Sequence, residues 1–306
     1  MKACHGIDEA GYGPLLGPLV VARTDFRGRP EWPAAAAGGA RRGLAAVQDS
    51  KRLLAGARGF RRLEATVLGF LAASGRGVPR SVREWLRLDP DLDELGDRPW
   101  YAGLDRPLPL EASTDDLRRA EDEIADGRVL EGGTFTGLRL RVLDERIYND
   151  RVDKSGNKHE SLFAEVAGLL DPVVGAAVSS WVSIDRLGGR RHYADKLRSA
   201  FPFVPVEVLD EVKGLSRYRL LPRDREVEVA FLVGGDARRP ETALASMYAK
   251  YTRELMMALF NEYWRGRAPG LQPTAGYYED GHRFLVELEG RGLLDAATRA
   301  ALIRRR

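Results

Sequence analysis

The sequence is poor in cysteine and has no long apolar run. Its 306 residues include one cysteine, Cys4, so an internal disulfide cannot form, and a reducing, cytoplasmic setting is expected. No apolar run approaches the ~20 residues that a bilayer-spanning helix needs. The N-terminus also lacks the pattern of a signal peptide. We therefore expect no membrane partner.

Several common catalytic motifs are absent as well. The sequence has no Walker loop, no His-Glu-x-x-His, no cysteine-based zinc spacing and no Gly-x-Ser-x-Gly elbow. Its 4 histidines are scattered and do not suggest a metal cluster of their own. The sequence therefore offers no other catalytic or metal site that competes with the carboxylates described below.

Length and composition indicate one enzyme-sized domain. The chain is 44% hydrophobic and 30% charged, which suits a single domain or one domain with a large insertion. We expect a single catalytic domain over residues 1–306, an insertion or subdomain of unknown role at 75–175 and a C-terminal segment at 265–306. A net charge of +3 permits nucleic-acid binding without arguing for it. A monomer is expected.

The stretch Gly6 to Pro18 is the most informative part of the sequence. Asp8 and Glu9 end a short apolar run, and a loop rich in glycine and proline leads to a second apolar run. This pattern predicts strand, tight turn and strand. At a strand end both carboxylates can reach one site, and the glycines let the backbone approach a phosphate closely. The alternative is that the two acids are solvated turn residues.

Two further acids lie at element boundaries. Asp185 ends an apolar, β-branched run, which predicts a strand with an acid at its C-terminal end. Taken alone, an Asp that caps the next helix would be the commoner explanation. Asp236 follows two glycines and precedes a long helix predicted from about 241 to 264. The alternative for that region is a small-residue packing helix with Asp236 in a turn.

Four separated motifs resemble ribonuclease HII, the type 2 ribonuclease H family. That family has Gly-Ile-Asp-Glu-Ala-Gly, a basic residue, then Gly-Pro-Leu, a small residue and Gly-Pro-Val. The stretch from Gly6 matches this signature or replaces its residues conservatively, except at Tyr12. Asp-Ser-Lys at 49–51 and the Gly-Asp followed by an Ala-Ser-x-x-Ala-Lys-x-Thr-Arg pattern up to Arg253 follow in the family's order. Asp185 with Tyr193 is closer to the type 3 relative.

The resemblance implies a fold, a reaction and a set of site residues. The fold would be RNase H-like α/β, a mixed sheet flanked by helices with an inserted subdomain. The reaction would be metal-dependent hydrolysis of the RNA strand of RNA–DNA hybrids, or of ribonucleotides embedded in DNA. Two Mg²⁺ or Mn²⁺ ions about 4 Å apart would serve it, and these hard ions take oxygen ligands. The implied catalytic and metal ligands are Asp8, Glu9, Asp185 and Asp236.

The resemblance also implies substrate contacts. Gly11, Tyr12 and Gly13 correspond to the turn that reads a ribonucleotide 2′-hydroxyl, together with a C-terminal tyrosine for which Tyr277 is the first candidate and Tyr278 the second. Phosphate or structural contacts are expected from Lys51, Arg186 and Lys250. His282 keeps the family spacing, but a lone histidine there is more often structural. The basic tail from Arg304 is expected to be a frayed end.

Tyr12 leaves the substrate open. Tyrosine cannot give the charged phosphate contact of the family's basic residue, although it can stack or donate one hydrogen bond. One alternative is a metal nuclease that acts on another nucleic acid, such as branched or single-stranded DNA. A second is an inactive RNase H-like module that binds nucleic acid, and a third is the same fold with unrelated chemistry.

Overall fold

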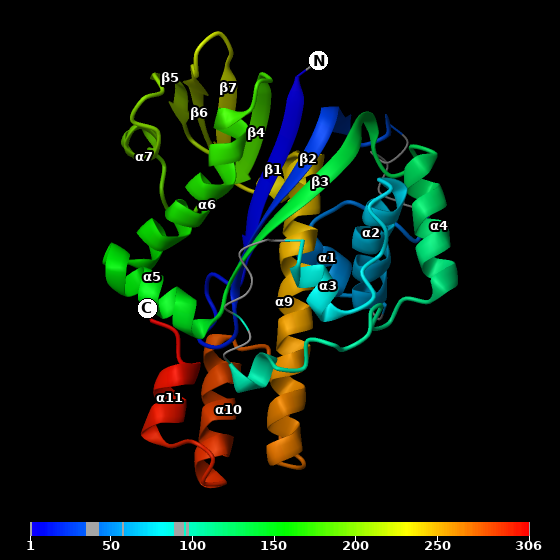
Figure 1. Cartoon of the computed structure of the whole chain (residues 1–306), viewed down its shortest axis with the longest axis vertical. Helices are drawn as coiled ribbons and strands as arrows, with labels where there is room; N and C mark the ends of the chain where they lie inside the picture. The colour runs from blue at the N-terminus through cyan, green and yellow to red at the C-terminus, as the bar shows by residue number, and fades with distance from the viewer. Residues whose placement is uncertain (1, 35–42, 57, 89–94, 96–97, 306) are drawn as a thin grey trace.

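The chain folds around a mixed sheet of seven strands. The computed structural model describes residues 2–34, 43–56, 58–88, 95 and 98–305, and within them the strands lie in the order β3-β2-β1-β4-β7-β6-β5 (Figure 1). The predicted α/β class with a mixed sheet is confirmed. The strands are β1 (Ala3–Ala10), β2 (Leu19–Glu31), β3 (Glu131–Leu143), β4 (Ser180–Asp185), β5 (Val206–Val212), β6 (Leu215–Leu220) and β7 (Val227–Leu232).

The three central strands are parallel and the outer ones antiparallel. β1 pairs in parallel with β4, and β4 pairs in parallel with β7. The β1–β2 hairpin predicted from the Gly- and Pro-rich turn is present, and β3 extends it on the outer side. The carboxyl ends of β1, β4 and β7 therefore meet at one edge of the sheet, the usual place for a ligand in an open α/β sheet.

Helices cover both faces of the sheet. α5, α6 and α7 lie on one face, and the long helix α9 lies on the other with α1 to α4 beyond it (Figure 1). Two apolar cores result, one on each face. The helices are α1 (Ser50–Leu54), α2 (Gly59–Ala73), α3 (Val82–Leu86), the 3₁₀ turn η3 (Pro99–Tyr101), α4 (Thr114–Ala125), α5 (Glu145–Ser155), α6 (Lys158–Gly175), α7 (Ala194–Ala200), α8 (Gly235–Arg238), α9 (Pro240–Arg267), α10 (Tyr278–Gly290) and α11 (Ala296–Leu302).

Close backbone contact fixes α9 against β1. A Cβ atom at Gly6 would lie 2.1 Å from the carbonyl carbon of Glu241, so only glycine fits where the helix begins. Thr24 Oγ1 donates to the carbonyl of Glu241 at 2.7 Å, and Ser183 Oγ donates to its carboxylate at 2.8 Å. The small residues early in α9 are buried, as the sequence predicts for a helix packed on a sheet.

Residues 75–175 and 265–306 contribute further helices and one strand of the sheet. The first range contains α3, η3, α4, β3, α5 and α6, of which β3 joins the sheet through β2. The second holds α10 and α11, and the C-terminus returns to lie beside α5 (Figure 1). None of the helices in the described ranges has the length and hydrophobicity of a membrane span.

The prediction of a frayed basic tail is wrong for Arg304. Its side chain is only 2% exposed, and its guanidinium lies 3.8 Å from the ring centroid of Tyr148 on α5. The backbone N–H of Arg304 donates to Leu15 at 3.0 Å. The tail is therefore tied to the loop that follows β1, because tertiary contacts outweigh the tendency of a chain end to fray.

Candidate active site

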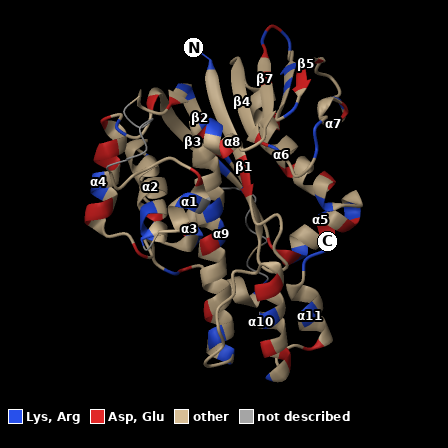
Figure 2. Ribbon diagram, turned by 180° about the vertical axis from the view of Figure 1, so that it is seen from behind, with Lys and Arg blue, Asp and Glu red and all other residues tan. Residues whose placement is uncertain are grey.

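Asp8 and Asp185 lie side by side at the carboxyl ends of two parallel strands. Ile7 on β1 is paired with Ile184 on β4, so the next residue on each strand is an aspartate. Asp8 is 6% exposed, and Asp185 is half-buried as the last residue of β4. β1 continues to Ala10, so Asp8 and Glu9 lie within the end of the strand and not in the turn that follows it. Figure 2 shows the acidic colour near this end of β1.

Asp236 follows the next strand of the sheet. β7 ends at Leu232, which is paired with Asp185, and Gly234 then turns the chain with a φ of 62°. The N–H of Gly235 donates to Asp185 Oδ1 at 2.7 Å, so the first residue of α8 touches the carboxylate that ends β4. Asp236 is the second residue of α8 and is half-buried. Three neighbouring segments thus present their acids at one edge.

The electrostatics of Asp8 reflect this crowding. Burial raises the pKa of Asp8 well above its usual value, and the charges of Glu9 and Asp185 raise it further. Hydrogen bonds from Ser246 and from the N–H of Glu9, the latter at 2.8 Å, act in the opposite direction. Like charges held together in this way disfavour ionisation until a cation or a proton compensates them.

The donors at this edge suit a hard divalent cation. They are carboxylate oxygens, which Mg²⁺ and Mn²⁺ prefer over nitrogen or sulfur. Across the described ranges, however, no group of three or more His, Cys, Asp or Glu is already arranged to hold a metal ion. The side chains therefore provide the right chemistry and the right edge of the sheet, without a preassembled cage.

The loop after β1 is bound to the segment before α10. The N–H groups of Leu15 and Leu16 both donate to the carbonyl of Gly276, at 2.8 and 3.1 Å. Tyr277, the next residue, is 47% exposed. The structure thus brings the glycine loop and the candidate C-terminal tyrosine together, although they lie at opposite ends of the sequence.

Two buried arginines hold this loop from beneath. Arg253 is 1% exposed and donates to the carbonyl of Ala275 at 2.8 Å, while its guanidinium lies 5.5 Å from the ring centroid of Tyr277. Arg304 Nη1 donates to the carbonyl of Gly11 at 2.5 Å. Gly11 has a φ of 88°, and a Cβ there would lie 2.8 Å from Arg253 Nε, so the loop needs glycine at this point.

Glu145 completes the support of the loop. It is fully buried, and its carboxylate accepts the N–H of Gly17 at 3.1 Å, the indole N–H of Trp100 at 3.2 Å and the hydroxyl of Tyr101 at 3.0 Å. Burial raises the pKa of Glu145 from 4.5 to about 7, against the lowering effect of its hydrogen bonds. The far end of the glycine loop is therefore bound to a buried acid.

The side chain of Tyr12 contacts the start of α6. Its hydroxyl lies 2.8 Å from Nδ1 of His159, and Nζ of Lys158 lies 5.1 Å from its ring centroid. Burial, and to a smaller extent the charges of Tyr148 and Glu9, raise the pKa of Tyr12 to about 12. The hydroxyl therefore keeps its proton at neutral pH.

The other predicted contacts are spread around the site. Arg186 follows Asp185 and is half-buried, and its N–H donates to Leu232 at 2.8 Å. Lys250 forms an ion pair with Glu254 at 3.2 Å and lines a separate cavity between α1, α9 and residues 273–275. Lys51 lies in α1, and its side chain falls outside the described part of the structure. Gly13 is exposed, and Tyr278 packs edge-on against His282.

Solved structures similar to this chain are ribonucleases of the HII and HIII types, the family that the motifs resemble. RNase HII of Archaeoglobus fulgidus, solved in complex with PCNA, is 16% identical, with a TM-score of 0.45 over 99% of this chain and 94% of that one. Ribonuclease H2 of Pyrococcus horikoshii OT3 is 14% identical, with a TM-score of 0.40 over 99% and 93%. RNase H3 of Aquifex aeolicus is 14% identical, with a TM-score of 0.39 over 98% and 71%.

No family model and no curated protein matches the sequence. At these identities and TM-scores, the likeness to the solved ribonucleases says nothing about activity. The functional argument therefore rests on the residues of the site.

Sequence reasoning missed several residues that shape the site. One of them is Ser246, whose hydroxyl binds Asp8 and lies 3.2 Å from that of Ser50. Glu145 and Arg304 were assigned no role. A buried acid and a buried base carry no local signal in the sequence, because their burial depends on contacts between distant segments.

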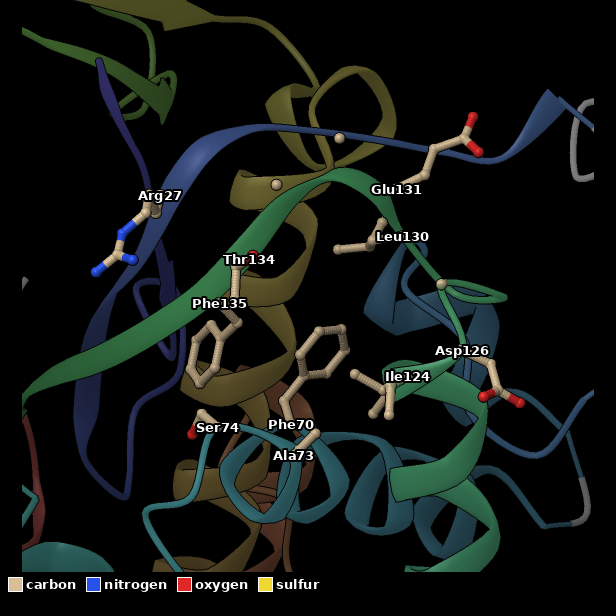
Figure 3. A pocket seen from close by; sticks show the side chains of 14 residues that line it. Arg27, Phe70, Ala73, Ser74, Ile124, Asp126, Leu130, Glu131, Thr134 and Phe135 are labelled. Carbon is tan, nitrogen blue, oxygen red and sulfur yellow. The ribbon is translucent and has the colours of Figure 1, made fainter. Parts of the chain in front are cut away.

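The pocket in Figure 3 lies away from the carboxylates. It lies between α2, α4 and the β2–β3 strands, with a volume of about 670 Å³, and none of the described residues that line it is a candidate site residue. Arg27, which lines it, is paired with Ala3 at the start of β1, whereas the acids lie at the end of that strand. The two places are at opposite ends of the same strands.

Proposed function

We propose that this protein is a metal-dependent endonuclease of the ribonuclease H type. It would cut the RNA strand of RNA–DNA hybrids, or ribonucleotides embedded in DNA, with Mg²⁺ or Mn²⁺. The observation that carries the proposal is the alignment of Asp8 with Asp185 on parallel strands, with Asp236 on the connection after the next strand. The raised pKa of Asp8 supports it, because crowded carboxylates favour a bound cation.

Asp8, Glu9, Asp185 and Asp236 would hold the metal. When bound, a divalent cation would supply charge neutralisation at the phosphate, an activated water and help for the leaving oxygen. The protein orients its ligands through fixed donors: the N–H of Glu9 and the hydroxyl of Ser246 hold Asp8, and the N–H of Gly235 holds Asp185. Such outer contacts aim the ligand oxygens.

The glycine loop and Tyr277 would bind the sugar and phosphate. Gly13 is exposed, and a Cβ there would meet nothing within 4 Å, so its backbone is open to a ligand. Tyr277 presents an exposed ring beside the same loop, and a phenol can stack on a sugar or donate to a hydroxyl. The hydrogen bonds of Leu15 and Leu16 to Gly276 hold the glycine loop next to the segment that carries Tyr277.

A panel of labelled duplexes tests the proposal. One duplex carries a single ribonucleotide, one is an RNA–DNA hybrid and one is all DNA, each with Mg²⁺ or Mn²⁺. We expect cutting only where ribonucleotides are present, and loss of cutting in Asp236→Asn. Because Tyr12 differs from the basic residue of the family signature, cutting of DNA alone would keep the metal nuclease and overturn its substrate. Tight binding without any cutting would instead identify a binding module.

A further inference from the structure

Three segments meet around the ring of Tyr12. The loop after β1 brings Tyr12 itself, the start of α6 brings Lys158 and His159, and the loop after β4 brings Gly188. A Cβ at Gly188 would lie 3.0 Å from Cε1 of His159 and 3.9 Å from Cε1 of Tyr12, so that loop runs directly against both rings. Both loops start next to candidate metal ligands. The junction therefore borders the acidic edge of the sheet.

The charge on Lys158 is not neutralised at this junction. In the described ranges its ammonium forms no ion pair, and its recorded contact is with the face of the Tyr12 ring at 5.1 Å. Two other basic residues are neutralised by a carboxylate on α6: Arg190 binds Glu160 at 3.0 Å, and Lys196 binds the same carboxylate. A cation that is held over a ring and lacks a carboxylate partner is available to an anion from solution.

His159 offers a second donor at the same place. Tyr12 keeps its hydroxyl proton and can donate it to Nδ1 of His159 over 2.8 Å. In a neutral imidazole whose Nδ1 accepts a hydrogen bond, the ring proton is on Nε2. His159 is exposed, so this Nε2–H can donate to a ligand oxygen. An ammonium and an N–H donor side by side suit a phosphate group.

We propose that Lys158 and His159, positioned by Tyr12, bind one backbone phosphate of the nucleic acid beside the candidate metal site. This inference rests on the proposed function and extends it to a contact from residues 75–175. Tyr12 then does not carry a charge toward the phosphate, as the basic residue of the family signature would. Instead, its ring contacts Lys158, a lysine from another segment.

The salt dependence of binding tests this site separately from catalysis. Binding of a labelled duplex that carries one ribonucleotide is measured by fluorescence anisotropy, in EDTA, over a range of salt concentrations. Each phosphate contact contributes about 0.9 to the slope of log K against log salt. We expect Lys158→Ala to weaken binding several-fold and to reduce the slope by about that amount, and His159→Ala to weaken binding with a smaller change in slope.

Two further variants sharpen the result. Lys154→Ala removes an exposed lysine from the last turn of α5 and should leave the slope unchanged, which controls for net charge. Tyr12→Arg, introduced together with Lys158→Ala, places a guanidinium where the ammonium was and should restore much of the lost slope. Restoration would separate a phosphate contact from a structural defect of α6, since Tyr12→Arg removes the contact with His159 and cannot repair the helix.

The outcomes for this site and for the nuclease are distinguishable. If the protein cuts ribonucleotide-bearing duplexes but Lys158→Ala binds with the parent affinity and slope, the phosphate site is refuted and the nuclease stands. If nothing is cut but the slope still falls in Lys158→Ala and recovers with Tyr12→Arg, the phosphate site stands without the nuclease. Equal losses in Lys154→Ala and Lys158→Ala would also refute the site, because they would reflect overall charge.

Discussion

Replacing Glu145 by glutamine should change how the stability of the protein depends on pH. Glu145 is fully buried beneath the glycine loop, and burial raises the pKa of its carboxyl from 4.5 to about 7. The folded state therefore holds the proton more tightly than the unfolded state. Ionisation of Glu145 costs the folded protein stability, and Glu145→Gln removes that cost because its amide does not ionise.

The size of the effect follows from the two pKa values. Each pKa unit corresponds to about 1.4 kcal/mol, so the rise from 4.5 to about 7 corresponds to about 3 kcal/mol. Below the unfolded pKa both states are protonated and Glu145 contributes no pH dependence. As the pH rises from about 4.5 to about 7 the free energy of unfolding falls, and above about 7 the loss is complete.

The variant also loses part of the hydrogen bonding. The carboxylate accepts bonds from Gly17, Trp100 and Tyr101, and the amide nitrogen of glutamine cannot accept any of them. One lost bond of this kind costs about 1 kcal/mol. We therefore expect Glu145→Gln to be less stable than the parent by about 1 kcal/mol below about pH 4, about as stable near pH 5, and more stable by about 2 kcal/mol near pH 8.

Urea unfolding of both proteins between pH 5 and pH 8 measures the difference. Glu111→Gln, which changes an exposed glutamate, serves as the matched control and should parallel the parent at every pH. A difference between Glu145→Gln and the parent that stays constant from pH 5 to pH 8 would refute the reasoning. It would mean that Glu145 titrates alike in the folded and unfolded chain.

Three further changes have expected outcomes. Arg304→Met should lower the free energy of unfolding by about 1–3 kcal/mol, because it removes the donor to the carbonyl of Gly11, and unchanged urea unfolding would contradict that role. Gly6→Ala should destabilise by about 1–3 kcal/mol or more, since its Cβ would lie 2.1 Å from the backbone of α9. Its control Gly168→Ala, in α6 with nothing within 4 Å, should stabilise by about 0.5–1 kcal/mol. Asp8→Asn should stabilise the metal-free protein above neutral pH, because the raised pKa of Asp8 means that its charge opposes folding there. Lower stability of Asp8→Asn in EDTA at pH 8 would contradict this.

Local signals predicted much of the fold. The glycines and prolines between two apolar runs predicted the β1–β2 hairpin, and the long helix α9 was predicted from about 241 to 264. These elements depend on turn chemistry and periodicity, which are written in neighbouring residues. The mixed sheet followed from the resemblance, and the structure contains it.

The supports of the site could not be predicted in the same way. The neighbourhood of Asp8 and Asp185 depends on parallel pairing between β1 and β4, which the spacing of the two residues does not determine. The contact of Tyr12 with His159 joins a loop to a distant helix, and Arg304 reaches its buried place only because the C-terminus returns to α5. Such contacts arise from tertiary packing.

Calorimetric titration with Mn²⁺ tests the central claim most directly, because it does not depend on which nucleic acid is the substrate. The parent protein should bind Mn²⁺ near neutral pH, and its affinity should fall as the pH is lowered, because the raised pKa of Asp8 means that protons compete with the metal for that carboxyl. Titrations at several pH values measure this dependence. Asp8→Asn and Asp236→Asn should lose most of the binding. Absence of Mn²⁺ binding by the parent, or equal binding by both variants, would contradict a metal site at the carboxyl ends of β1 and β4.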